Sequence, residues 1–259
     1  MIPRRLWYNT SMLSAIVTGA TSGIGRATAL HLAGLGYGVL AIGRDAAALG
    51  ACASEIGGAC ATLAADVTAP EAPDRIIAAA LERFGGIDVL VNAAGIIGSG
   101  TIENTTDEAW DRMMDLNVRS VFRLMRAAAP HLAERRGAIV NVSSVAGLRS
   151  FPGILAYAVS KAAVDQLTRC AALDFAPKGV RVNAVDPGVV VTNLHRRSGM
   201  AEEQYAAFLE RSKETHPLGR PGQAGEIAEL IAFLATPRSG WITGETIAID
   251  GGRHLTCAR

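Results

Sequence analysis

The stretch Leu13–Gly25, LSAIVTGATSGIG, decides the fold of this chain. An apolar run of strand length ends at Thr18, and the glycines Gly19, Gly23 and Gly25 follow it and open a helical pattern. Such a turn needs glycine where φ is positive, where the backbone approaches a phosphate and where helix packs closely on strand, and the helix N-terminus offers free N–H groups to the anion. The spacing GxxxGxG after a strand predicts a dinucleotide-binding loop, with an ordinary tight turn as the alternative.

The same alternation of apolar strand and amphipathic helix continues along the chain. Further strand-like runs are YGVLAIG (37–43), ATLAAD (61–66), IDVLVNAAG (87–95), GAIVNVSS (137–144), VRVNAVDPG (180–188) and ETIAIDGG (245–252). One helical stretch begins at Asp45. The others cover about 70–84, 106–135, the segment around Tyr157, 203–213 and 223–234. Almost continuously apolar strands indicate a sheet covered on both faces, and βαβ order makes it parallel. We predict an α/β fold: a single-domain, doubly wound (Rossmann-type) parallel sheet of about seven strands with helices on both faces.

Composition excludes several classes of protein. The chain has 259 residues, 49% of them hydrophobic, and 25 Lys and Arg nearly balance 24 Asp and Glu. This balance leaves no electrostatic footprint for nucleic acid or a membrane surface. No 18 apolar residues run uninterrupted, and neither the cysteines nor the histidines have metal-ligand spacing. We expect a cytoplasmic protein acting on small molecules, with no metal site, an N-terminal arm at 1–12 and a dinucleotide-binding domain at 13–259.

A tyrosine and a lysine stand four residues apart in AYAVSK, residues 156–161. At this spacing Tyr157 and Lys161 lie on one face of a helix, about 5 to 6 Å apart at Cβ. In a structural interpretation the lysine extends along an apolar surface beside a packed tyrosine. In a catalytic one the lysine lowers the tyrosine pKa from about 10 by roughly three units, or about 4 kcal/mol. A cation about 4 Å away supplies that energy only in a partly dry cleft.

The tip of the second strand, AIGRD, places Gly43, Arg44 and Asp45 where a nucleotide-binding sheet usually holds the adenosine ribose. If Arg44 faces the ribose, its guanidinium suits a 2′-phosphate. If Asp45 faces it, the carboxylate accepts from the diol and repels a phosphate. A solvated charge at a strand end is the third interpretation of Arg44.

From Ser14 to Gly252 the chain resembles the single-domain short-chain dehydrogenase/reductases. The motifs that carry the resemblance are TGATSGIG (18–25), ADV (65–67), NAAG (92–95), LNV (116–118), IVNVSS (139–144), YAVSK (157–161), NAVDPG (183–188) and ITGETIAIDGG (242–252). Two positions depart from the family pattern. Ala93 replaces the second Asn of the usual NNAG, and Asp186 precedes Pro187 where small residues are more usual.

The resemblance implies an NAD(P)-dependent oxidoreductase that transfers a hydride between a nicotinamide cofactor and a carbonyl or secondary alcohol. Tyr157 is implied as general acid/base, and Lys161 as the cation that lowers its pKa and binds the nicotinamide ribose. Ser144 would hold the substrate carbonyl, and Asn117 would anchor a water that links Lys161 to solvent. The implied cofactor-binding residues are Gly19, Thr21, Ser22, Gly23, Ile24, Gly25, Arg44, Asp66, Val67, Asn92, Ala93, Ala94, Gly95, Tyr157, Lys161, Pro187, Gly188, Val190 and Thr192.

The family register also bears on the cofactor. The acidic position of NAD-preferring members falls on Gly43, and Arg44 occupies the next position, where NADP-preferring members carry a basic residue. The resemblance therefore favours NADP over NAD. The competing hypothesis from another class is a nucleotide-binding sensor without turnover, which would tend to lose Tyr157 or Lys161.

Substrate and partners remain open on the sequence. The segment 189–222 is predicted as a lid. The wall after Ser144 is made apolar by Phe151, Pro152, Ile154 and Leu155, which favours a ketone, cyclic alcohol or acyl substrate. Arg196 and Arg197 either meet an anionic substrate or form a solvated loop. A carrier-linked 3-oxoacyl reductase is one specific possibility, in which Arg135 and Lys178 would dock the carrier protein. The resemblance also implies a homotetramer or dimer, built on the long helix, the Tyr157 helix and the IDGG region.

Overall fold

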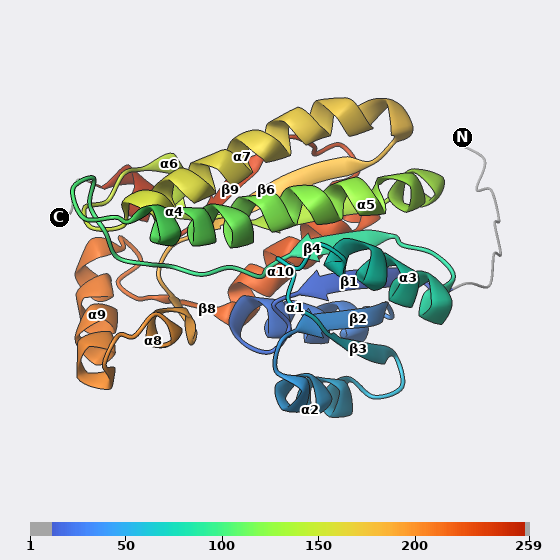
Figure 1. Ribbon diagram of the computed structural model, residues 1–259, viewed down its shortest axis with the longest axis horizontal. Coiled ribbons are helices and arrows are strands. Elements are labelled where there is room, and N and C mark those ends of the chain that lie inside the picture. The colour runs from blue at the N-terminus through green and yellow to red at the C-terminus, as the bar shows by residue number, and fades with distance from the viewer. Residues whose placement is uncertain (1–11, 257–259) are drawn as a thin grey trace.

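The computed structural model describes residues 12–256, so the predicted arm at 1–12 lies almost wholly outside the described residues. Within them, seven parallel strands form one sheet in the order β3-β2-β1-β4-β5-β6-β9 (Figure 1). The strands are β1 Ser14–Thr18, β2 Gly38–Gly43, β3 Cys60–Ala64, β4 Val89–Asn92, β5 Ala138–Val142, β6 Arg181–Pro187 and β9 Thr246–Ile249. Strand order reverses between β1 and β4, which is where such sheets bind ligands. The predicted doubly wound parallel sheet is confirmed.

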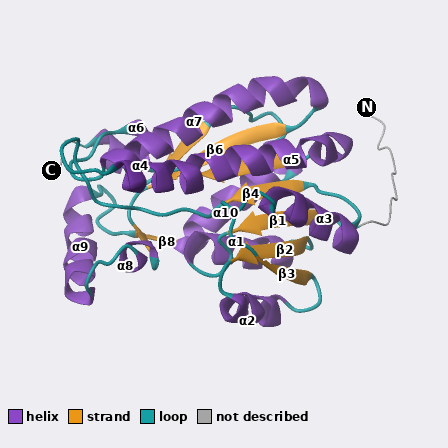
Figure 2. Ribbon diagram, in the orientation of Figure 1, coloured by secondary structure: helices purple, strands orange, loops and turns teal. Residues whose placement is uncertain are grey.

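Helices cover both faces of this sheet (Figure 2). The longer ones are α1 Gly23–Gly34, α2 Ala46–Ile56, α3 Ala72–Phe84, α4 Asp107–Met114, α5 Ser120–Arg135, α7 Leu155–Phe175, α9 Glu202–Thr215 and α10 Ala224–Ala235. One apolar core lies between the sheet and α3, α5 and α7, and a second lies between the sheet and α1, α2 and α10. Buried aliphatic side chains on both faces explain why the strands are almost continuously apolar.

The long helix predicted over 106–135 is interrupted in the structure. Thr106 caps α4 by accepting a hydrogen bond from Ala109 N, but a π-helical turn over Asp115–Arg119 separates α4 from α5. The buried Asn117 lies in this turn, and its side chain bonds the backbone of Ile96 as well as Met113 Sδ in α4. π-Turns of this kind often occur at functional sites.

The segment predicted as a lid forms its own small layer. It contains α8 Leu194–Arg197 and α9, framed by the two-stranded pair β7 Val190–Val191 and β8 Gly222–Gln223. This layer stands at one end of the sheet, with α6 Val145–Leu148 also at that end (Figure 1). Across residues 12–256 we find no helix with the length and apolarity that crossing a bilayer requires.

Candidate active site

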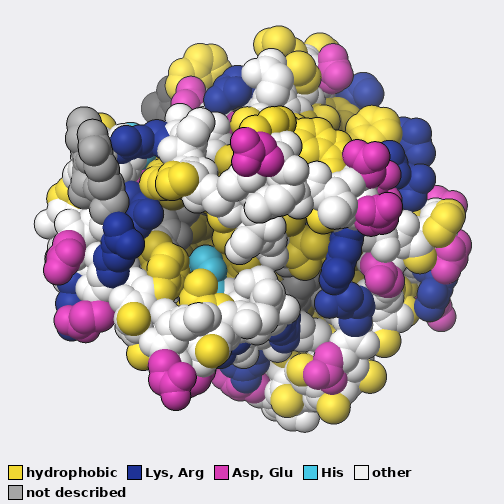
Figure 3. All heavy atoms as spheres, turned by 60° about the vertical axis from the view of Figure 1, so that its left-hand side comes forward, with side chains coloured by type: hydrophobic (Ala, Val, Ile, Leu, Met, Phe, Trp, Pro, Cys, Tyr) yellow, Lys and Arg dark blue, Asp and Glu magenta, His cyan; other side chains and the backbone are white. Residues whose placement is uncertain are grey.

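A cleft of about 1190 Å³ opens at the carboxyl ends of β1, β4, β5 and β6. It runs from the glycine turn after β1, past the segments that follow β4 and β5, to the lid helices. Figure 3 shows a hollow on this face in which hydrophobic side chains gather, with Lys and Arg side chains on either side of it. Ligand pockets usually measure about 300–1000 Å³, so this cleft is large enough for a dinucleotide and a substrate together.

The glycine turn has the geometry of a pyrophosphate cradle. Gly19 adopts φ 69°, and a Cβ there would lie 2.7 Å from the carbonyl oxygen of Ala93. Gly23 adopts φ 54°, and a Cβ on Gly25 would lie 2.4 Å from the carbonyl oxygen of Gly19. Any larger residue at Gly19 or Gly25 would displace backbone, so the turn can hold α1 against β1 only with glycine. The residues present therefore fit a dinucleotide.

The turn after β4 is tied to β1 although its second residue is alanine. The Thr18 hydroxyl accepts hydrogen bonds from Ala93 N at 3.0 Å and Ala94 N at 3.1 Å. Asn92 donates to Asn141 Oδ1 at 2.9 Å within the sheet. The two glycine-containing segments therefore form one rigid wall, and Ala93 does not disrupt it.

At the adenosine end the structure separates Arg44 from Asp45. The Asp45 carboxylate accepts a hydrogen bond from Ala48 N and caps α2, whereas Arg44 lines the cleft and is exposed. Asp66 accepts from Thr68 N and Oγ1, and these bonds, together with the Arg44 charge, lower its pKa. Arg44 is therefore the cation beside the predicted adenosine site.

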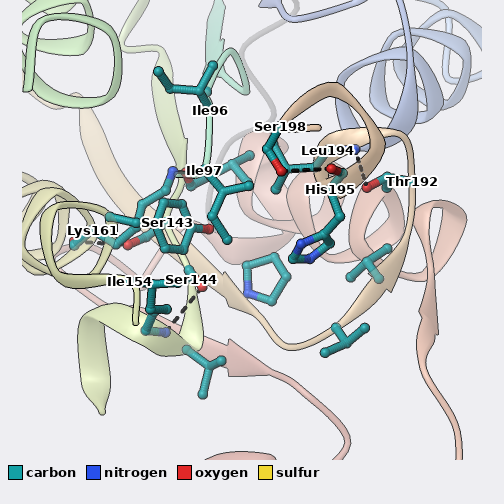
Figure 4. Close-up of a pocket in the computed structure, with 18 of the residues that line it drawn as sticks. Ile96, Ile97, Ser143, Ser144, Ile154, Lys161, Thr192, Leu194, His195 and Ser198 are labelled. Atoms are coloured by element: carbon teal, nitrogen blue, oxygen red, sulfur yellow. Dashed lines mark hydrogen bonds between the residues drawn. The ribbon is translucent and has the colours of Figure 1, made fainter. Parts of the chain in front are cut away.

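Three of the predicted catalytic residues meet at the floor of the cleft. Ser144, Tyr157 and Lys161 are buried and line it, and Ser144 also caps α6 by accepting from Ala146 N at 3.1 Å (Figure 4). Lys161 Nζ donates to Val142 O at 2.9 Å and lies 5.7 Å from the centre of the Tyr157 ring. The spacing seen in the sequence therefore places both side chains in the same dry site.

The electrostatics of the pair differ from the prediction. Burial raises the pKa of Tyr157, the Ser144 hydroxyl lowers it and the Asp186 carboxylate raises it, for a net increase. Burial lowers the pKa of Lys161 to about 8, against the charges of Asp165 and Asp186. The expected depression of the tyrosine pKa is absent because desolvation by burial outweighs the effect of the Ser144 hydroxyl, and Lys161 Nζ donates to Val142 O.

Asn117 holds the segment after β4 in place. Its Oδ1 accepts from Ile96 N, and its Nδ2 donates to Ile96 O and to Ser160 Oγ, each at 3.0 Å. A Cβ on Gly95 would lie 3.3 Å from Asn117 Oδ1 and 3.6 Å from Lys161 Nζ, so glycine lets this backbone approach both side chains. Asn117 thus reaches the site through backbone and Ser160, and the predicted water remains a prediction.

Sequence reasoning missed a buried carboxylate pair behind the site. Asp165 on α7 and Asp186 on β6 are buried, and among the described residues neither carboxylate has a hydrogen-bond partner. The nearby Ser143 hydroxyl donates instead to Lys161 O at 3.1 Å. Burial and the Asp165 charge raise the pKa of Asp186 to about 8. The unusual Asp186 before Pro187 was the only sequence signal, and nothing linked it to Asp165.

The segment 189–222, predicted as a lid, contributes the opposite wall. His195 lines the cleft, packs on Phe208 with ring centres 4.5 Å apart, and has a pKa lowered by burial. In Figure 4 its ring faces Ile97 across the cavity. Arg196 points elsewhere, since it pairs with Glu202. This segment therefore presents the aromatic rings of His195 and Phe208 to the cleft, together with the basic side chains of Arg197 and Arg211.

Most of the predicted site residues line the cleft, and five do not. The exceptions are Thr21, Asp66, Val67, Asn92 and Asn117. Val67 and Asn92 are buried behind the surface, and the Thr21 methyl lies where a side chain on Gly43 would go. The cleft is also lined by Arg112 and Met113 from α4 and by Arg253 after β9, and no sequence motif marked these three residues.

Comparison with known proteins gives concordant matches. A family model described as Enoyl-(Acyl carrier protein) reductase matches residues 19–254. The 3-oxoacyl-acyl-carrier-protein reductase FabG of Vibrio cholerae is 37% identical over 93% of this chain and 97% of its own length. The 3beta-hydroxysteroid dehydrogenase 1 of Eggerthella lenta is 36% identical over 93% of this chain and 94% of its own.

Solved structures agree with these relatives. A short-chain dehydrogenase/reductase of unknown function from Caenorhabditis elegans, crystallised with cofactor, superposes with a TM-score of 0.90 at 37% identity, over 95% of this chain and 96% of that one. A short-chain type dehydrogenase/reductase from Mycobacterium marinum gives a TM-score of 0.86 at 34% identity, over 95% and 96%. The likeness covers 95% of this chain in both cases and so extends beyond the sheet.

Proposed function

The chain belongs to the short-chain dehydrogenase/reductase family and is an NAD(P)-dependent oxidoreductase, and from this premise we propose that Tyr157 is its general acid and that it reduces ketones with NADPH. The observation that carries the proposal is the burial of Tyr157 and Lys161 side by side with Ser144, at the end of a cleft that begins with the glycine turn. A sensor without turnover is not favoured, because such a protein has no use for this buried pair.

The residues of the site divide the work of carbonyl reduction. A bound reduced nicotinamide supplies the hydride. Ser144 donates a hydrogen bond that holds the carbonyl oxygen, and Tyr157, kept protonated by its raised pKa, gives its proton to that oxygen as negative charge develops. The remaining phenolate lies near the Lys161 ammonium and the Ser144 hydroxyl, which stabilise it in a dry site more strongly than they would in water.

The preference for NADP rests on Arg44. Its exposed guanidinium lines the adenosine end of the cleft, and the Asp45 carboxylate is engaged as a helix cap. A side chain on Gly43 would meet the Thr21 methyl at 2.4 Å, so an acidic group at that position would require Thr21 to move. Arg44 is therefore placed to bind a 2′-phosphate with nothing acidic directly before it.

Turnover tests the assignment of Tyr157. Absorbance of the reduced nicotinamide is followed with NADPH and then NADH across ketones, sugars and acyl thioesters. We expect Tyr157→Phe to bind NADPH as the wild type does and to lose about 10²-fold or more of kcat, the usual contribution of a general acid. Tyr37→Phe is the matched control, because Tyr37 is buried but does not line the cleft.

Two outcomes would contradict the proposal. A Tyr157→Phe variant with undiminished kcat would remove the tyrosine as the acid. Tight NADPH binding by the wild type without turnover of any compound in the panel would favour the sensor.

The relatives suggest a narrower substrate, a 3-oxoacyl group on a carrier protein. Arg135 and Lys178, the proposed docking residues, lie at helix ends; Arg135 donates to Gly85 O at 3.2 Å and Lys178 lies over the Phe175 ring. The acyl thioester arm of the panel tests this substrate. Carrier-bound thioesters reduced no faster than carrier-free ones would exclude the docking role.

A homotetramer or dimer is the proposed assembly. Phe122 on α5 and Val159 and Leu173 on α7 are exposed large apolar side chains on the two helices that the family resemblance assigns to an interface. Burying them against a second copy would remove apolar surface from water. Light scattering of the purified protein gives the number of copies.

A further inference from the structure

The cleft is lined by charges of one sign. Six arginines and Lys161 line it, and within residues 12–256 no aspartate or glutamate does. Basic and acidic residues are nearly equal in number over the whole chain, 25 against 24, so composition does not produce this segregation. A concave site with basic side chains and apolar walls concentrates anions. The cofactor phosphates explain Arg44 at the adenosine end, but they do not explain the basic side chains elsewhere in the cleft.

Arg253 lies away from the adenosine end. Its guanidinium stacks over the Phe151 ring at 4.8 Å and donates from Nη1 to Thr215 Oγ1 at 2.7 Å. Phe151 belongs to the wall that follows Ser144, and Thr215 is the last residue of lid helix α9. Arg253 therefore connects the substrate wall with the lid, beside the space where a substrate chain would lie.

Arginines on the outer side of the lid have acidic partners, and Arg253 has none of this kind. Arg196 pairs with Glu202, and Arg220 pairs with Glu226, each at 2.6 Å, and neither arginine lines the cleft. No carboxylate of the described chain lies within ion-pair distance of Arg253. Arg196 and Arg220 are thus neutralised by carboxylates of the chain itself. Arg253, which faces the cleft, is left for another anion.

The environment of Arg253 disfavours an uncompensated charge. Burial lowers the pKa of Arg253, and the neighbouring charges of Arg149 and Arg211 lower it further. The Asp250 carboxylate acts in the opposite direction, but it accepts hydrogen bonds from Gly252 N, His254 N and His254 Nδ1 and does not line the cleft. An anion bound from the cleft would relieve this cost.

We propose that the natural substrate carries, besides its carbonyl, a negatively charged oxygen group, carboxylate or phosphate, and that Arg253 binds this group. The proposal rests on the proposed function, since it names the substrate class of the same site. A guanidinium has five N–H donors in a planar fork that matches either anion, and within residues 12–256 the Arg253 guanidinium gives one hydrogen bond to protein. The apolar side chains of the wall would hold the carbon chain between the two polar ends.

Matched substrates test the charge directly. A series of oxo acids of increasing length, each paired with its methyl ester, is assayed with NADPH, and phosphate monoesters of hydroxyketones form a second anionic arm. Binding of every compound to the protein saturated with NADP is measured in parallel by calorimetry. We expect acid or phosphate to be favoured over the neutral partner by about 10-fold or more, as for a charge-assisted hydrogen bond in a half-buried site.

Substitutions then locate the anion site. Arg253→Gln should bring the ratio of acid to ester close to one. Arg196→Gln should leave the ratio as in the wild type, because Arg196 pairs with Glu202 and does not line the cleft. Arg253→Lys keeps the charge without the fork and should retain part of the preference. Thermal unfolding of each variant shows whether it is folded. The ratio of acid to ester in the wild type tests the proposal even if a variant does not fold.

The outcomes separate this inference from the proposed function. Esters bound and reduced as well as acids and phosphates at every length would overturn the inference and leave ketone reduction intact. Anions bound through Arg253 without reduction would support the inference and contradict the proposed function. A strong acid preference that survives Arg253→Gln in a folded variant would place the anion elsewhere and overturn the assignment of Arg253.

Discussion

The two ends of the cleft are built by opposite means. At the end formed by β1, α1 and β4, the decisive feature is missing side chains: Gly19 and Gly25 leave room for carbonyl oxygens that a Cβ would contact at under 3 Å. At the end formed by β5, β6 and α7, the decisive feature is buried side chains, with Lys161 and the unpartnered carboxylates of Asp165 and Asp186 in the interior. One end is fixed by backbone geometry and the other by electrostatics.

This difference decides what each end tolerates. A backbone cradle fails when any atom is added, and its failure does not depend on pH. A buried ionisable cluster keeps its shape when a carboxylate becomes an amide, but its energy depends strongly on pH. Substitutions at each end test that distinction.

The largest effect is expected from adding one methyl group to the backbone end. In Gly25→Ala the new Cβ would lie 2.4 Å from Gly19 O and 2.9 Å from Thr18 O, and these are backbone atoms that cannot rotate away. We expect a loss of about 1–3 kcal/mol or more in the free energy of unfolding, typical of overpacking, together with loss of NADPH binding. Chemical denaturation and fluorescence titration measure the two quantities.

Gly34→Ala is the matched control in the same helix. A Cβ at Gly34 meets no atom within 4 Å, so this substitution should be neutral or stabilise α1 by about 0.5–1 kcal/mol. Equal behaviour of the two variants would show that the close approach at Gly25 does not matter.

The electrostatic end predicts a pH dependence instead. Asp186 has a pKa of about 8 in the folded protein against 3.8 as its ordinary value, so the folded state keeps a proton that the unfolded state has lost between these limits. Its contribution to stability is therefore present at low pH and is lost as pH rises toward 8, by up to about 1.4 kcal/mol per pH unit. Asp186→Asn should flatten this slope and raise stability at neutral pH, measured as the free energy of unfolding across the range.

The groups around Asp186 set the control. The groups that interact with Asp186 are Asp165, Lys161, Tyr157 and the Ser143 hydroxyl. The Arg169 charge lowers the pKa of Asp165. Asp165→Asn should flatten the slope as well, because the Asp165 carboxylate raises the pKa of Asp186. Asp66→Asn should not, since hydrogen bonds lower the pKa of Asp66 and its contribution is lost at low pH. An unchanged slope in Asp186→Asn would exclude a proton held by this pair.

The same contrast explains which features of the fold and site could be predicted from the sequence. The glycine turn, the parallel sheet and the Tyr157–Lys161 pair were predictable because each is a local pattern with a fixed spacing. The structure confirmed the parallel sheet, and the comparisons with known proteins confirmed the family. The interruption of the long helix at Asn117 was not predictable from local sequence, because Asn117 bonds Ile96, twenty-one residues away in sequence.

Features assembled from distant segments escaped prediction for the same reason. Asp165 and Asp186 come from a helix and a strand that are separate in the sequence. Arg253 follows the last strand of the sheet and contacts Phe151, which follows β5. The direction of the Tyr157 pKa was also wrong, because pair spacing gives the charge of a neighbour but not the depth of burial. Spacing predicts which side chains meet on one element, whereas desolvation depends on the whole fold.

The smallest effect is expected at the exposed edge of the backbone end, where side-chain charge enters. Arg44→Ser should weaken NADPH binding by about 10-fold, the size of one charge-assisted hydrogen bond, and leave NADH binding nearly unchanged. Because Arg44 is exposed, part of its effect should disappear at high salt. Titration of both cofactors at two salt concentrations measures this.

Arg26→Ser separates a specific phosphate contact from a general loss of positive charge near the turn. Arg26 lies on α1 directly after Gly25, but it pairs with Glu55 and does not line the cleft, so its removal should leave the ratio of NADPH to NADH affinity unchanged. If Arg44→Ser leaves that ratio unchanged too, Arg44 is a solvated charge and the adenosine end contains no side-chain determinant of cofactor choice. If only Arg44→Ser lowers it, cofactor choice is the one property of the backbone end that depends on a side chain rather than on glycine.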